Sequence, residues 1–180
     1  MVEELYIKKV LNGDTEAFRY FVTTYKDLAF SVAVSIVKDE FTAADVVQES
    51  FVKAFENLKS FKGKSNFSTW FYKIVINESF KIVQRRKVQY TDSLIELEDV
   101  SKDELKDADQ KFYVNEVLKI MSPNESLVLR LFYLNENSVK EICEMTGWDE
   151  SKVKVTLHRA RKSMEEKLGK LLKKEVNSLL

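Results

Sequence analysis

The sequence of 180 residues has few of the residues that interrupt helices, since it holds one proline and four glycines. Such a composition favours helices over the turn-rich strands of an all-β fold. It also holds one cysteine and one histidine, so no internal disulfide can form and no Cys/His cluster suggests zinc. Cys143, in the segment KEICEM, is interpreted as a small buried apolar residue rather than a nucleophile. We therefore expect an all-α protein without a metal or other cofactor.

Long apolar runs are also missing from the sequence. None approaches the roughly 20 residues that a membrane-spanning helix needs, so we expect no membrane insertion. The first residues, MVEELYIKKVLNGD, lack the basic start and apolar run of a signal peptide, which predicts a cytoplasmic protein. No paired carboxylates in an evident pocket and no phosphate-cradling glycine loop are present. An enzyme is therefore the least favoured class of function.

The charges balance but are segregated along the chain, which has 29 basic and 29 acidic residues. Residues 62–90 carry seven basic residues and one acidic residue, and residues 150–174 carry nine and three. Between these blocks, residues 91–109 carry two basic and eight acidic residues. This pattern is typical of two anion-binding surfaces, although two basic solvent-exposed helix faces would give the same counts.

The acidic block is interpreted as a linker, 89–109, between two small helical domains, 1–88 and 110–175. In the first domain, Asp14 is a predicted N-cap, and Thr42 of the segment TAAD is predicted to open a helix with a capping box.

The second domain contains clearer helix starts. Ser122, Pro123 and Glu125 combine a cap, a first-turn proline and a capping-box glutamate. The segment SVKE, from Ser138 to Glu141, repeats the capping-box pattern. Two short helices broken at TGWDES and followed by a longer helix predict a helix-turn-helix.

The long helix after this turn has one apolar side and one basic side. Its apolar residues recur at the helical period and form one stripe: Val153, Leu157, Ala160, Met164 and Leu168. The other side and its flank carry mainly polar and basic residues: Ser151, Lys154, Val155, His158, Arg159, Arg161 and Lys162. Such a helix suits the major groove of DNA, although a merely basic surface helix would look similar.

The first basic block contains a second unusual stripe, on a helix predicted from about Asn66 to Arg86. An indole is followed by cations and amides at helical spacing: Trp70, Lys73, Asn77, Lys81 and Gln84. This set is unsuited to a core and suits single-stranded nucleic acid, whose bases stack on aromatic rings while lysines follow the backbone. Phe67, Phe71 and Ile74 are predicted to face the core, and Trp70 fits either role.

One domain for a single strand and another for duplex DNA are what promoter opening requires. The order DVVQESFVKAFENLKSFKGKSNFSTWFYKIVINESFKIVQRR, then a helix-turn-helix ending VKVTLHRARK, resembles the bacterial sigma-70 factors of the extracytoplasmic-function group. The resemblance covers nearly the whole chain. It implies a non-enzymatic transcription initiation factor whose partners are core RNA polymerase, promoter DNA and an anti-sigma protein.

The resemblance also implies roles for individual residues. In the segment DVVQESFVKAF, six residues match the part of the family that docks on the polymerase clamp: Asp45, Val46, Gln48, Glu49, Phe51 and Phe55. The loop FKGKSNF matches the loop that captures a flipped base of the −10 element. With the stripe that follows, this gives eight residues for the −10 strand: Lys64, Ser65, Asn66, Phe67, Trp70, Lys73, Asn77 and Lys81. Four residues fall where the family reads the −35 element, and the polar side of the same helix adds two more. The −35 set is therefore Ser151, Lys154, Val155, His158, Arg159 and Lys162.

A different class of protein gives a second hypothesis. A self-sufficient helix-turn-helix regulator, whose first domain senses a ligand or dimerises, would share the second domain. It would leave the stripe from Trp70 to Gln84 without a purpose, and it would bind duplex DNA without polymerase.

Overall fold

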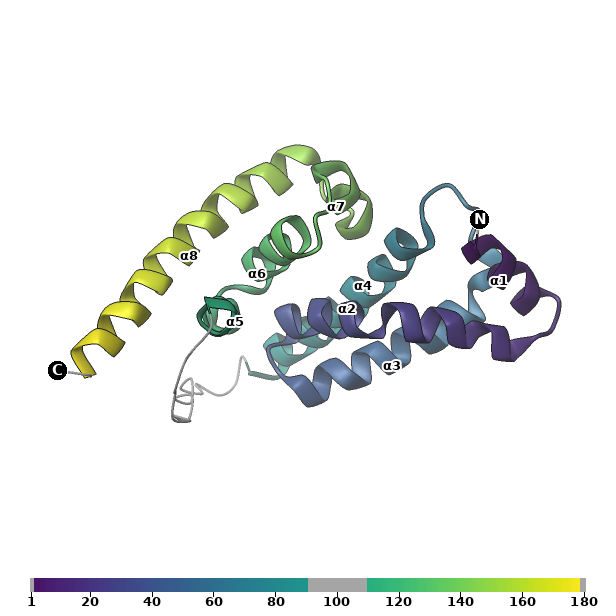
Figure 1. Ribbon diagram of the computed structural model, residues 1–180, viewed down its shortest axis with the longest axis horizontal. Helices are drawn as coiled ribbons and strands as arrows, with labels where there is room; N and C mark the ends of the chain where they lie inside the picture. The colour runs from purple at the N-terminus through teal and green to yellow at the C-terminus, as the bar shows by residue number, and fades with distance from the viewer. Residues whose placement is uncertain (1, 91–109, 179–180) are drawn as a thin grey trace.

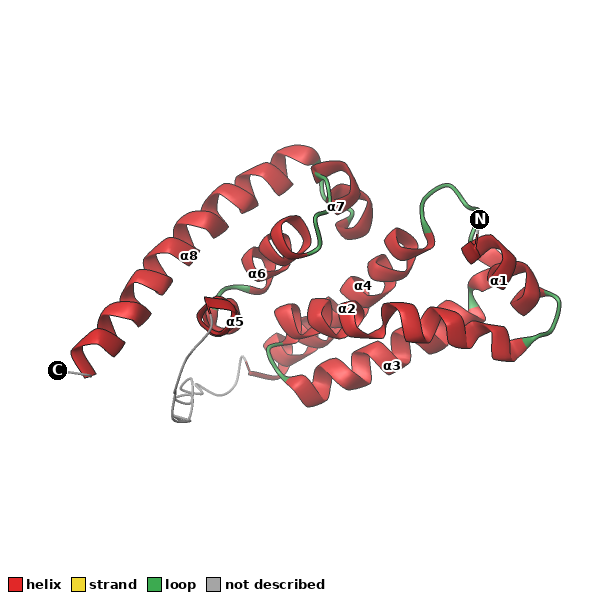
Figure 2. Ribbon diagram, viewed as in Figure 1, coloured by secondary structure: helices red, strands yellow, loops and turns green. Residues whose placement is uncertain are grey.

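The computed structural model describes residues 2–90 and 110–178, and all regular structure within these residues is helical (Figures 1 and 2). The helices form an N-terminal half and a C-terminal half that lie side by side (Figure 1). The predicted all-α class is confirmed. Apart from its first two residues, the predicted acidic linker, 89–109, lies outside the described residues, so its limits stay a prediction.

The N-terminal half is built around three helices that pack against one another, α2, α3 and α4. Its elements are α1 (Val2–Leu11), η1 (Thr15–Phe18), α2 (Arg19–Val37), α3 (Glu40–Glu56), η2 (Leu58–Ser60) and α4 (Phe67–Tyr90). Aromatic rings from different helices meet in its core, with Phe21 and Phe67 at 4.2 Å and Phe51 and Phe71 at 4.4 Å between ring centroids. Burial of such large rings dominates the stability of a small bundle.

The start of α3 differs from the prediction. Asp39, not Thr42, is the N-cap, and its carboxylate accepts a hydrogen bond of 2.7 Å from the Thr42 backbone N–H. The predicted box was wrong because an aspartate earlier in the chain competes for the same orphan N–H groups, and it is the better cap. The hydrogen bonds from Thr42 hold the pKa of the Asp39 carboxyl below its ordinary value. At the other predicted cap, the Asp14 carboxylate accepts from the Ala17 N–H, as expected.

The C-terminal half confirms the predicted helix-turn-helix. Its elements are α5 (Gln110–Ile120), α6 (Pro123–Leu129), the π-helical turn η3 (Arg130–Leu134), α7 (Val139–Thr146) and α8 (Glu150–Ser178). Ser122 caps α6, and Ser138 and Glu141 form the predicted capping box of α7. Gly147 ends α7 with a φ of 72°, a left-handed conformation that suits glycine and lets α8 leave at a new angle.

The two halves contact each other where α7 packs against α4 and α6 packs against α2. At this boundary the Lys38 ammonium donates a 2.6 Å hydrogen bond to the Leu118 carbonyl, and the Arg130 guanidinium donates to the Ser31 hydroxyl. Burial, together with the nearby charge of Arg130, lowers the pKa of Lys38 to about 8. The Lys38 side chain at this boundary therefore carries a charge that is costly to bury.

Candidate nucleic-acid and polymerase surfaces

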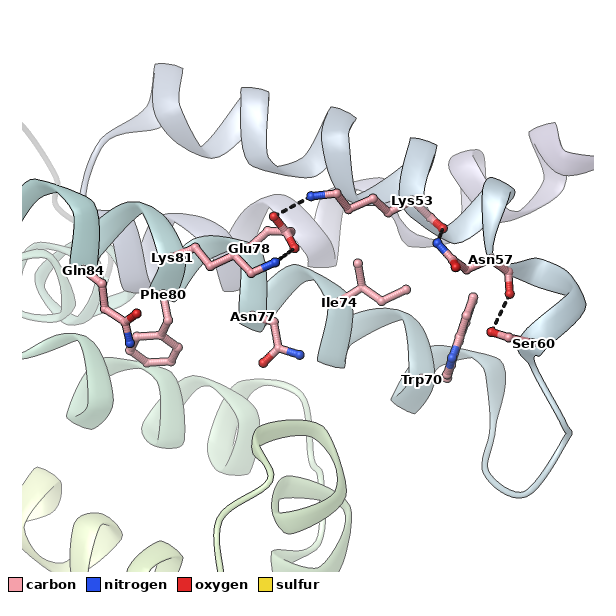
Figure 3. Close-up of a pocket in the computed structure, with 10 residues that line it drawn as sticks. All are labelled: Lys53, Asn57, Ser60, Trp70, Ile74, Asn77, Glu78, Phe80, Lys81 and Gln84. Carbon is pink, nitrogen blue, oxygen red and sulfur yellow. Dashed lines mark hydrogen bonds and ion pairs between the residues drawn. The ribbon is translucent and has the colours of Figure 1, made fainter.

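A groove of about 510 Å³ runs along α4 and the C-terminal end of α3. It is lined by ten residues drawn in Figure 3: Lys53, Asn57, Ser60, Trp70, Ile74, Asn77, Glu78, Phe80, Lys81 and Gln84. The predicted stripe contributes four of them, and Trp70, Asn77 and Gln84 project from the same side of α4 (Figure 3). Lys73, the fifth member of the stripe, is exposed on the same helix but does not line the groove.

Trp70 is both a core residue and a groove residue. Its half-buried ring lies 5.3 Å from the ring of Phe61 and 5.5 Å from that of Phe67, measured between centroids. The rest of the indole borders the groove, so the ring is partly packed and partly accessible, and its role in nucleic-acid binding stays a prediction. A ring braced on one face by other aromatics offers a pre-ordered surface for stacking.

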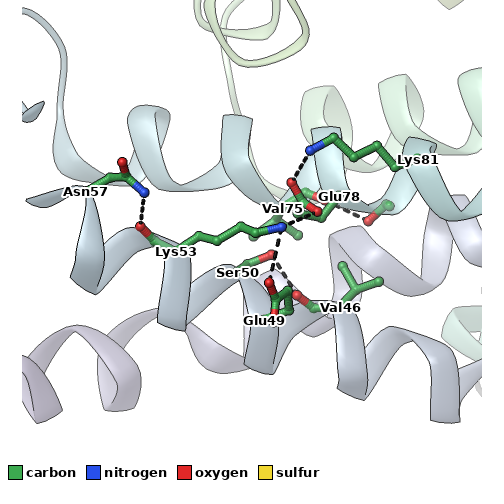
Figure 4. Close-up of polar contacts among 9 residues, drawn as sticks. Val46, Glu49, Ser50, Lys53, Asn57, Val75, Glu78 and Lys81 are labelled. Atoms are coloured by element: carbon green, nitrogen blue, oxygen red, sulfur yellow. Dashed lines mark hydrogen bonds and ion pairs between the residues drawn. The ribbon is translucent and has the colours of Figure 1, made fainter.

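A carboxylate that the sequence analysis did not single out lies at the centre of the groove wall. The Glu78 oxygens accept hydrogen bonds of 2.7 Å from Lys53 and 2.6 Å from Lys81, and Lys53 also lies 3.2 Å from Glu49 (Figure 4). Burial of Glu78 opposes its ionisation, but the two lysines outweigh burial and lower the pKa of its carboxyl. Glu78 could have been noticed as the one acidic residue among residues 62–90.

The loop before α4 borders a second groove, of about 410 Å³. Lys64 and Asn66 are exposed there, with Ser65 half-buried between them, and Gly63 makes the turn with a φ of 65°. Glu141 and Glu144 of α7 also line this groove, so the basic loop faces carboxylates of the C-terminal half. Favourable charge pairing of this kind is modest at an exposed site.

Phe67 must be removed from the candidate −10 surface. Its side chain is 1% exposed and lies among the rings of Phe21, Phe61 and Phe71, so it supports the loop from behind. Its role as a core residue, which the helical spacing also predicted, is the one that the structure bears out.

The outer face of α3 presents the predicted polar docking residues, since Asp45, Gln48 and Glu49 are all exposed. Val46 is 4% exposed and Phe51 is also buried, so neither is available to a partner in this conformation. Val46 is therefore corrected from a contact to a core residue, because it lies on the side of the helix that faces the bundle. Phe55 is half in solvent, and its ring packs 5.2 Å from that of Phe18 between centroids.

The start of α8 presents its polar side to solvent. Six predicted residues are exposed there: Ser151, Lys154, Val155, His158, Arg159 and Lys162. The opposite side is buried, with Val153 and Ala160 fully enclosed. The Lys154 ammonium lies 2.5 Å from the Glu150 carboxylate one turn earlier, a partner that the sequence analysis did not consider.

The described part of the chain offers no group of three or more His, Cys, Asp or Glu side chains that could hold a metal ion. Among the helices of residues 2–90 and 110–178, none is long and apolar enough to cross a membrane.

Comparison with known proteins gives a consistent result for both halves. Residues 21–88 match the family model for sigma-70 region 2, and residues 111–164 match that for sigma-70 region 4. The RNA polymerase sigma factor YlaC of Bacillus subtilis (strain 168) is 35% identical over 144 residues, which are 74% of this chain and 82% of that protein. The ECF RNA polymerase sigma factor SigW of the same organism is 27% identical over 92% of this chain and 96% of its own length.

A solved structure supports the same fold. The sigma factor RpoE of Bartonella quintana, crystallised with the anti-sigma factor NepR, superposes with a TM-score of 0.70 at 22% identity. The similarity covers 84% of this chain and 96% of that one. With two sigma-70 regions in order, and relatives matched over most of their length, this chain belongs to the extracytoplasmic-function group of sigma-70 RNA polymerase sigma factors.

Proposed function

We propose how this sigma factor divides promoter recognition among its surfaces. The outer face of α3 docks on core RNA polymerase through Asp45, Gln48 and Glu49. The loop at Lys64 and the α4 groove hold the melted −10 strand, and the exposed side of α8 reads the −35 duplex. The working units are residues 1–88 and 110–175. The chain acts in the cytoplasm, where its polymerase is, and has no enzymatic activity of its own.

One observation carries the assignment of the −10 strand. Trp70, Asn77 and Lys81 border a single groove, so a stacking surface, an amide and a cation lie along one path. Bases of a single strand stack on aromatic rings, amides can bond to the edge of an extruded base, and lysines pair with phosphates. Duplex DNA would present none of its base faces to such a groove.

The −35 assignment is supported by the exposed polar side of α8 behind its glycine turn. The N-terminal part of a recognition helix meets base edges, and its cations meet phosphates. Val155, which is 46% exposed, is suited to contact with a thymine methyl group but cannot donate a hydrogen bond.

An anti-sigma protein is proposed as a further partner. Two structures similar in fold are sigma factors crystallised with such proteins: RpoE of Bartonella quintana with NepR, and CnrH with the cytosolic domain of CnrY. In this chain, a groove of about 380 Å³ lies between α2 and α5 and is lined in part by Phe30, Val34 and Leu118. Apolar lining of this kind would accept an amphipathic helix of a partner.

The first test is co-elution of the chain with core RNA polymerase on a sizing column, without DNA. We expect a stable complex, followed by promoter-dependent transcription. The rival hypothesis, a self-sufficient regulator, instead predicts no complex and tight binding of the free chain to duplex DNA.

The −10 assignment is tested by the variant Asn77→Ala. Its control is Asn12→Ala, which makes the same change at an exposed residue in the turn that follows α1. We expect Asn77→Ala to lower transcription about tenfold or more, as for loss of a bidentate base contact, while co-elution with polymerase is unchanged. Loss of co-elution, or full transcription, would show that Asn77 has another role.

A further inference from the structure

The Glu78 carboxylate occupies an unexpected place on a surface proposed to hold a polyanion. It is the one acidic residue among residues 62–90, and its side chain is 14% exposed on the wall of the groove. A carboxylate beside phosphates repels them, so a purely electrostatic groove would be better without it.

Its contacts indicate what the carboxylate does. One Glu78 oxygen accepts from Lys81 on the next turn of α4, and the other accepts from Lys53, which comes from α3 (Figure 4). One residue thereby fixes two ammonium groups that belong to different helices and border the same groove. Figure 3 shows both lysine side chains extended toward Glu78.

The charges of this cluster cancel. Glu49, Lys53, Glu78 and Lys81 form a chain of alternating sign, with contacts of 3.2, 2.7 and 2.6 Å between successive ammonium and carboxylate atoms. Glu49 does not line the groove, so the cluster adds only one net positive charge there, and what it chiefly supplies to a strand is the placement of its two cations. Each ammonium has three N–H donors, so both lysines keep at least one for a phosphate.

We propose that Glu78 is a positioning residue for the −10 strand, and that Lys53, which it holds in place, is an additional strand-binding residue. The inference rests on the proposed function of the groove. A free lysine side chain loses rotamer entropy when it is ordered. Glu78 orders the two lysines before the strand arrives, so less of that cost remains at binding.

The test is Glu78→Gln, which keeps the shape of the side chain and removes its charge. The probe is a short fluorescein-labelled oligo(dT), titrated against the full chain at several salt concentrations. We expect binding about fivefold weaker, the size of one ordering cost for a side chain, and a smaller salt slope. Glu56→Gln is the matched control, because it makes the same change at an exposed residue near the end of α3.

The opposite sign would overturn the positioning role. If Glu78 only repels phosphates, Glu78→Gln tightens binding, as any added net positive charge would. A combined variant gives a second readout: because Glu78 acts through both lysines, Glu78→Gln should cause little further weakening when added to Lys53→Met/Lys81→Met, and full additivity would contradict this. Thermal unfolding of each variant identifies a change that merely destabilises the bundle.

Lys81→Met alone separates this inference from the proposed function. If Lys81→Met leaves oligo(dT) binding unchanged, the groove does not hold a strand, and both proposals fail. If Lys81→Met weakens binding while Glu78→Gln strengthens it, the groove assignment stands and the positioning role is rejected. Lys53→Met should weaken binding as Lys81→Met does, and no effect would exclude Lys53 from the strand path.

Discussion

The groove on α4 and the exposed side of α8, the two surfaces proposed to bind nucleic acid, hold their cations in different ways. In the groove, Lys53 and Lys81 share the Glu78 carboxylate across two helices. On α8, Lys154 pairs with Glu150 of the same helix, and both side chains are more than half exposed. A flexible single strand needs contacts fixed in advance, whereas a duplex is itself rigid and can be met by mobile side chains on a rigid helix. If the proposed roles are correct, a similar excess of basic residues serves two kinds of recognition in this chain.

The largest expected effect is a loss of stability in the N-terminal half, which carries the groove. Phe71 is 0% exposed and its ring stacks 4.4 Å from that of Phe51, so Phe71→Ala leaves a cavity in the core of the N-terminal half. We expect a loss of about 3–5 kcal/mol in the free energy of unfolding of the N-terminal half, measured by urea denaturation. Phe41→Ala, at a side chain that is 87% exposed, should change it by less than about 0.5 kcal/mol. Equal effects would contradict the core assignment.

The next effect concerns the boundary between the N-terminal and C-terminal halves. Lys38 lies at this boundary, facing Arg130 and Glu125, and its pKa of about 8 is below its ordinary value of 10.5. The buried charge therefore weakens the contact at neutral pH. Between about pH 8 and 10.5, Lys38 is deprotonated when the two halves are in contact but protonated when they are apart. The equilibrium constant for contact between the halves therefore rises with pH, by at most about tenfold per pH unit.

Small-angle X-ray scattering across this pH range should show the chain becoming more compact. Lys38→Met removes this titrating group, so between pH 8 and 9, below the ordinary pKa values of lysine and tyrosine, its scattering should change much less than that of the wild type. A wild-type profile without pH dependence would mean that Lys38 does not control the boundary.

The smallest expected effect is on duplex binding, and it contrasts the Glu150 carboxylate of α8 with the Glu78 carboxylate of the groove. Glu150 competes with phosphates for Lys154 and fixes no second lysine, so Glu150→Gln should tighten duplex binding about two- to fivefold. This change is opposite in sign to the one expected for Glu78→Gln on single strands. The measurement is the fluorescence anisotropy of a labelled promoter duplex titrated with the holoenzyme that transcribes from it. Glu166→Gln, further along α8, is the control, and weaker binding by Glu150→Gln would remove the contrast.

Local signals in the sequence predicted much of this structure. The capping box at Ser138, the turn at Gly147 and the buried stripe of α8 depend on residues within one or two helical turns. The error at Thr42 arose because Asp39, three residues earlier and the stronger N-cap, was not considered.

Contacts between distant segments could not be predicted in the same way. Lys53 and Glu78 are 25 residues apart, and Lys38 and Leu118 are 80 apart, so no helical period relates them. Val46 is a different case: the family resemblance alone assigned it to a partner, although it faces the bundle. The residue-level roles of the groove and of α8 stay predictions, because geometry places side chains without showing what binds them.

The sharing of one carboxylate by two lysines has an evolutionary consequence. A substitution at Glu78 alters two neighbours together, so changes in the −10 groove are expected to be epistatic and to need compensating partners. Side chains on the exposed side of α8, such as His158 and Arg159, can change one at a time at little cost to the fold. Relatives of this protein should therefore diverge in −35 preference by single steps, while their −10 preference changes rarely and in concert.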